Sequence, residues 1–94
     1  MRTLNFKSEE VRRSLTALPP ELKKKVRFAL KDILEDPLCG KALIEELEGL
    51  RAYKIGRFRI VYKPEGNFVV ILSMGSRKTI YEKLLIELKR QFKG

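Results

Sequence analysis

Residues Leu50 to Tyr81 read LRAYKIGRFRIVYKPEGNFVVILSMGSRKTIY, and this stretch decides the fold because it holds three apolar runs divided by turn residues. Gly56 separates the first run from the second, and the segment 64–67, Pro-Glu-Gly-Asn, separates the second from the third. Runs rich in β-branched and aromatic residues with such breaks are typical of consecutive hairpin strands. The expected strands are Arg51–Ile55, Phe58–Lys63 and Phe68–Met74.

The middle run predicts two different faces, because successive side chains of a strand point to opposite sides of the sheet. One face would carry Phe58, Ile60 and Tyr62, and the other would carry Arg57, Arg59, Val61 and Lys63. We expect the aromatic and aliphatic face to pack against helices and the arginine face to stay open. The last run is almost entirely apolar, as in a strand covered on both faces.

The rest of the chain predicts one more strand and three helices around this unit. Ser8 is placed to cap the first helix, and an apolar stripe at spacings of three and four marks the second. Residues 38–49 predict a loop or a single turn. The expected elements are a strand at Arg2–Phe6 and helices at Glu9–Leu18, Pro20–Glu35 and Thr79–Phe92. The order β-α-α-β-β-β-α predicts an α+β fold, with a small, largely antiparallel twisted sheet, an N-terminal helix hairpin on one face and a C-terminal helix.

Length and composition restrict the classes of function. Ninety-four residues predict a single domain, 1–94. The formal net charge of +9 favours a nucleic acid or an acidic protein as partner. There is no histidine and one cysteine, Cys39, so an intrachain disulfide, a zinc cluster and histidine-based catalysis are excluded. No apolar run approaches the length of a membrane span, and we expect a cytoplasmic protein.

Three short motifs occur in a recognisable order. They are Leu47–Leu50 (LEGL), Lys54–Tyr62 (KIGRFRIVY) and Gly75–Arg77 (GSR) followed by Tyr81. In order and spacing the chain resembles the RelE/ParE toxin superfamily over nearly its whole length. The resemblance implies the toxin of a bacterial or archaeal toxin–antitoxin pair. RelE-type members cut mRNA in the ribosomal A site, whereas ParE-type members act on DNA gyrase with the same fold.

The resemblance also implies candidate catalytic residues. Arg59 matches the strand arginine of the family, Arg77 the arginine after the last strand, and Tyr81 the aromatic residue at the start of the terminal helix. Lys54 matches a basic position of the preceding strand. Gly56 departs from the pattern, because some RelE members have there a second lysine credited with proton transfer.

Cleavage of RNA by its own 2′-hydroxyl requires a base for that hydroxyl, positive charge at the phosphate and help for the leaving oxygen. Arg59 is the candidate for the phosphate, which a guanidinium can hold with two parallel hydrogen bonds. Lys54 is the candidate base, on the condition that neighbouring cations favour its neutral form. Arg77 would assist the leaving group electrostatically, and Tyr81 would stack on an unpaired base. Neither a metal nor another cofactor is expected.

Further cations are expected to bind nucleic acid, namely Arg51, Arg57, Lys63 and Lys78. The expected partners are a cognate acidic antitoxin, the ribosome and mRNA. Two other functions stay open: a ParE-like gyrase inhibitor that acts by binding, and a basic RNA-binding module without catalysis. Two residues have structural alternatives, since Tyr81 could serve core packing and Arg59 could pair with an acid of the segment 45–48.

Overall fold

The computed structural model describes residues 2–44 and 47–76. Its elements are β1 (Thr3–Phe6), α1 (Glu9–Thr16), α2 (Pro20–Glu35), β2 (Lys41–Ala42), β3 (Arg51–Ile55), β4 (Phe58–Glu65) and β5 (Phe68–Ser76). The predicted α+β fold, with four strands and two N-terminal helices in the expected order, is confirmed. The helix expected at 79–92 lies outside the described residues.

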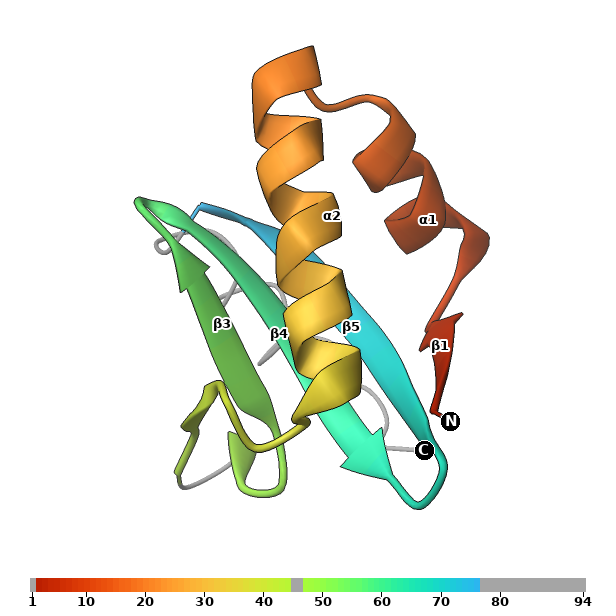
Figure 1. The fold of residues 1–94 in the computed structure, drawn as a ribbon, viewed down its shortest axis with the longest axis vertical. Helices are drawn as coiled ribbons and strands as arrows, with labels where there is room; N and C mark the ends of the chain where they lie inside the picture. The colour runs from red at the N-terminus through yellow and green to blue at the C-terminus, as the bar shows by residue number, and fades with distance from the viewer. Residues whose placement is uncertain (1, 45–46, 77–94) are drawn as a thin grey trace, which may run out of the picture.

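The strands form one sheet in the order β1-β5-β4-β3-β2 (Figure 1). β2, β3, β4 and β5 pair antiparallel, whereas β1 joins β5 in parallel. Gly56 and Gly66 have φ angles of 58° and 54°, which explains glycine in both hairpin turns, because other residues are strained there. β2 was not predicted, since residues 38–49 were expected to contain only a loop or a turn. A strand of two residues is too short to show a periodic pattern.

Both helices begin where the sequence predicts. The Oγ of Ser8 accepts a hydrogen bond of 3.3 Å from the backbone N–H of Val11 at the start of α1, and Pro20 is the first residue of α2. α1 ends at Thr16, two residues earlier than expected. α2 has no basic residue in its last turn, and Arg2 donates instead to the final carbonyl groups of Leu34 and Glu35.

The main core lies between the two helices and one face of the sheet (Figure 1). Its buried residues are Val26, Ala29, Leu30, Ile33, Ile60, Tyr62, Val69 and Ile71. Phe58 packs against this cluster, so the predicted inner face of β4 is confirmed. In the described part of the chain, no helix is long and apolar enough to cross a membrane.

The opposite face of the sheet, which we call the Arg59 face, was expected to be open. It carries instead a second apolar cluster of Leu50, Ala52 and Val61, with Leu43, Leu47 and Leu72 packed against it. Arg59 itself is only 8% exposed. The prediction of an open arginine face is therefore wrong for Arg59. Alternation along β4 gives the side of the sheet correctly, but it does not show what covers that side.

Candidate functional site

The register of β3 and β4 brings two of the predicted catalytic residues together. Lys54 lies directly opposite Arg59 in the antiparallel ladder. Opposed residues project from the same face with Cβ atoms about 4.5–5.5 Å apart. The candidate base and the candidate phosphate ligand are thus neighbours on the Arg59 face.

Arg59 is held in place by the turn that precedes it. Its Nη1 donates a hydrogen bond of 2.9 Å to the carbonyl of Gly56. A guanidinium has five N–H donors in all, so the others can serve an anion. The alternative was that Arg59 forms an ion pair with an acid of the segment 45–48. The ion pairs of residues 2–44 and 47–76 do not include Arg59, so Glu48 is not its partner. Glu45 and Glu46 lie outside the described residues.

A hollow of about 380 Å³ lies beside this pair, and we call it the cation hollow. Its lining residues are Lys41, Leu43, Ile44, Leu47, Ala52, Lys54 and Arg59. Ile44 is 75% exposed at its rim. In β5, Gly75 lies opposite Arg59 and adds no side chain beside the guanidinium. The cations of this hollow offer positive charge to an anion such as a phosphate, and its aliphatic side chains offer apolar contacts.

Two of the predicted nucleic-acid-binding cations have structural partners. Arg51 donates from Nε and Nη2 to the carbonyl groups of Gly40 and Leu38, at 2.9 and 3.0 Å. It lies opposite Tyr62 in the ladder, on the helix side of the sheet. Lys63 forms an ion pair of 3.0 Å with Glu65, roughly 13 Å along the strand from Arg59 at 3.3 Å per residue. The structure brings neither to the cation hollow.

Of the remaining predicted site residues, the structure describes one, Arg57. Arg57 is exposed in the turn between β3 and β4, two residues before Arg59. Arg77, Lys78 and Tyr81 lie outside the described residues, and their roles stay predictions. Lys41 is a lining residue that the sequence did not reveal, because its position on this face depends on the pairing of β2.

The segment that carries Lys41 is fixed to the core by Tyr62. The Oη of this fully buried residue donates to the carbonyl of Pro37 at 2.7 Å and accepts from the N–H of Gly40 at 2.9 Å. Burial raises the pKa of Tyr62 above its ordinary value, and the Gly40 contact opposes part of that rise. Desolvation likewise raises the pKa of the Cys39 thiol, and a raised pKa disfavours the thiolate needed for a nucleophile.

Stability is therefore expected to fall at alkaline pH. A phenol whose pKa is higher in the folded than in the unfolded chain stabilises the fold fully below its ordinary value of 10.0, and this contribution is lost as the pH rises through the folded pKa. Urea unfolding measured from pH 8 to pH 11 should show this loss in the native protein. Tyr62→Phe should lose less over the same interval. Equal losses in both proteins would contradict the role of Tyr62, since every other ionisable side chain is present in both.

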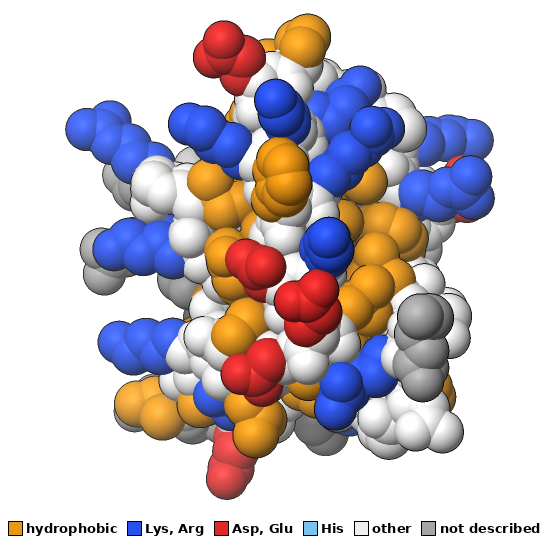
Figure 2. Space-filling view, in the orientation of Figure 1, with side chains coloured by type: hydrophobic (Ala, Val, Ile, Leu, Met, Phe, Trp, Pro, Cys, Tyr) orange, Lys and Arg blue, Asp and Glu red, His pale blue; other side chains and the backbone are white. Residues whose placement is uncertain are grey.

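Acidic side chains at the end of α2 line a second hollow. Asp32, Glu35 and Asp36 line this hollow of about 600 Å³ together with Cys39 and Tyr53. The hydroxyl of Tyr53 donates to Asp32 at 2.9 Å. Figure 2, which looks onto α2, shows basic side chains around the upper part of this helix and acidic ones over its lower part. The described residues contain no group of three or more His, Cys, Asp or Glu arranged to hold a metal ion.

Comparisons with known proteins agree on one family. The family model described as "ParE toxin of type II toxin-antitoxin system, parDE" matches residues 8–81. The structure of the toxin–antitoxin complex RelBE2 from Mycobacterium tuberculosis contains a chain that is 35% identical, with a TM-score of 0.69, covering 81% of this chain and 98% of that one. No protein with a curated function matches the sequence significantly.

Two more distant structures show the same fold. The isolated RelE toxin of E. coli has 18% identity and a TM-score of 0.70, with 94% of this chain and 99% of that chain covered. A YoeB/ParE toxin from Agrobacterium tumefaciens has 13% identity and a TM-score of 0.67, with 80% and 98% covered. At these identities the likeness supports the fold and nothing finer.

Proposed function

The chain belongs to the RelE/ParE superfamily of toxins of type II toxin–antitoxin systems, and on that premise we propose that it is a ribosome-dependent endoribonuclease that cuts mRNA in the A site and so inhibits translation. The observation that carries the proposal is the direct opposition of Lys54 and Arg59 beside the cation hollow. Cleavage of RNA by its 2′-hydroxyl needs positive charge at the phosphate and a proton acceptor close together, and this pair offers both. In this proposal residues 1–94 act as one domain.

The two residues would divide the chemistry of RNA cleavage. Arg59, preorganised by its bond to Gly56, neutralises the charge that develops on the phosphate oxygens, as fixed donors in a water-poor site do effectively. Lys54, exposed on the same face, is the proposed acceptor of the proton of the 2′-hydroxyl. Arg77 and Tyr81 are proposed to assist the leaving oxygen and to stack on the adjacent base. No metal is required for this division of roles.

A cognate antitoxin is the proposed protein partner, and a cytoplasmic location follows from a ribosomal target. Structures of relatives contain a toxin with its antitoxin. Ile44 and Leu47 offer apolar contacts beside Lys54 and Arg59. An acidic, partly disordered segment that folds on binding would match both features of this surface. Such a segment would cover the cation hollow and block the substrate.

A reconstituted translation reaction tests the proposal directly. Messenger RNA on ribosomes, with a defined codon in the A site, should be cut when this protein is added, whereas the same RNA without ribosomes should stay intact. Primer extension locates the cut. Addition of the antitoxin should prevent it.

Gyrase inhibition is the second candidate, favoured by the description of the matching family model as a ParE toxin. A DNA supercoiling assay with purified gyrase separates the two. We expect no inhibition at concentrations that cut mRNA. Inhibited supercoiling together with intact mRNA would replace the nuclease proposal by the gyrase proposal.

A further inference from the structure

Lys41 has no role in the proposed chemistry, yet the sheet places it beside the residues that have one. It lies opposite Ala52 in the β2–β3 ladder, and Ala52 packs in the apolar cluster of the Arg59 face. Lys41 and Lys54 are therefore diagonal neighbours on that face, at roughly 7–8 Å, within reach of long side chains. Both line the cation hollow with Arg59.

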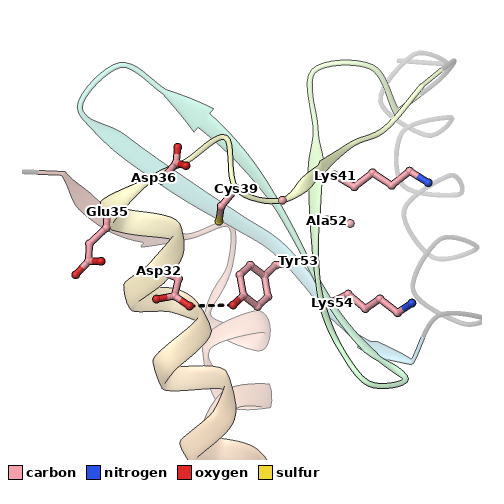
Figure 3. A pocket seen from close by; sticks show the side chains of 9 residues that line it. Asp32, Glu35, Asp36, Cys39, Lys41, Ala52, Tyr53 and Lys54 are labelled. Carbon is pink, nitrogen blue, oxygen red and sulfur yellow. Dashed lines mark hydrogen bonds between the residues drawn. The ribbon is translucent and has the colours of Figure 1, made fainter.

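The direction of the two lysine side chains supports the same placement. Figure 3 shows Lys41 and Lys54 extending side by side, away from Asp32, Glu35 and Asp36. Although the acids and the lysines line one hollow, the ion pairs found in the described residues include neither lysine. The positive charge of Lys41 is thus directed to the same space as that of Lys54.

We propose that Lys41 is a third cation of the site, which binds a backbone phosphate of the RNA next to the phosphate held by Arg59. The proposal rests on the proposed function for the identity of the anion. Extended RNA has one charge per nucleotide, and a row of three cations on one sheet face can follow such a backbone. Lys41 positions the strand, while Arg59 and Lys54 act on the bond that breaks.

A lysine on an edge strand can also have a simpler purpose, since charged side chains there prevent pairing with another chain. Lys41→Glu separates the two roles because it keeps a charge on the edge but reverses its sign. If Lys41 only protects the edge, Lys41→Glu should bind RNA as the native protein does. If it contacts phosphate, binding should weaken while the protein keeps the oligomeric state of the native chain in gel filtration.

The decisive measurement is the salt dependence of binding to a labelled eight-nucleotide single-stranded RNA. Each phosphate contact contributes about −0.7 to the slope of log K against log salt. Lys41→Ala should make the slope less steep by about 0.7, and Lys41→Arg should restore it. Lys31→Ala is the matched control, because it removes the same charge from an exposed position of α2 and should leave the slope unchanged.

Each outcome decides the matter. An unchanged slope in Lys41→Ala, an equal change in Lys31→Ala, or absence of RNA binding by the native protein at low salt would overturn the proposal. The readout uses free RNA and no ribosome. A changed slope without cleavage on ribosomes would therefore reject the nuclease function and keep Lys41 as an RNA contact. Cleavage with an unchanged slope would support the nuclease function and reject Lys41 as an RNA contact.

Discussion

Arg59→Ala is expected to lower the rate of mRNA cleavage on ribosomes by roughly 10²–10³-fold, the loss found when one preorganised donor to a developing negative charge is removed. Arg59 is 8% exposed as a residue, and its guanidinium is already bonded to the carbonyl of Gly56, so it needs little reorganisation when the charge appears. Single-turnover cleavage of a programmed ribosome measures the effect. In cells, expression of the variant should no longer arrest growth.

Two variants make this result interpretable. Arg13→Ala removes the same charge from an exposed position of α1, and its rate should stay within a few-fold of the native rate. Arg59→Lys keeps the charge but loses the planar fork, and it should fall between native protein and Arg59→Ala. Circular dichroism and thermal unfolding must show that each variant is folded. Full activity of a folded Arg59→Ala would refute the assignment.

Gly40→Ala is expected to destabilise the fold by about 2–3 kcal/mol, in the upper part of the range for overpacking a filled site. A Cβ at this position would lie 2.6 Å from the Oη of Tyr62 and 2.9 Å from the carbonyl oxygen of Ala52. The Ala52 atom is backbone and cannot move aside without shifting β3. Urea unfolding gives the change in free energy from the shift in midpoint at constant slope.

The double variant Gly40→Ala/Tyr62→Phe tests whether the hydroxyl is the atom in conflict. Tyr62→Phe alone removes the contacts of Oη with Gly40 and Pro37 and should cost about 1–3 kcal/mol by leaving buried backbone groups unpaired. The double variant should lose clearly less free energy of unfolding than the sum of the losses in the two single variants, as for residues in direct contact. Strict additivity would mean that the hydroxyl of Tyr62 is not the atom in conflict, since Phe keeps the ring carbon that lies 2.9 Å from the added Cβ.

Local patterns in the sequence were sufficient to predict most of the fold. Alternation placed Phe58, Ile60 and Tyr62 on the core side of β4, because the two-residue period of a strand is fixed by backbone geometry. Gly56 and Gly66 marked the turns, where their positive φ angles exclude most other residues. Ser8 and Pro20 marked the helix starts. Each of these signals depends on neighbours within a few residues.

The candidate site was predictable only in part. The structure places Lys54 opposite Arg59, because the short Gly56 turn fixes the register of the hairpin that joins them, and their catalytic roles stay predictions. Arg51 and Lys63 were equally basic in sequence, yet their partners are Gly40, Leu38 and Glu65. Charge alone could not separate cations that bind the protein's own carbonyl or carboxylate groups from cations that stay available.

The sequence by itself determined the order of the described elements and the two faces of β4. The tertiary structure decided that Arg59 is buried, that residues 41–42 form an edge strand, and that Lys41 joins the cation hollow. The physical reason is distance along the chain. Helix caps, turns and strand alternation are local, whereas the burial of Arg59 and the place of Lys41 depend on contacts among segments that meet only when the sheet is assembled.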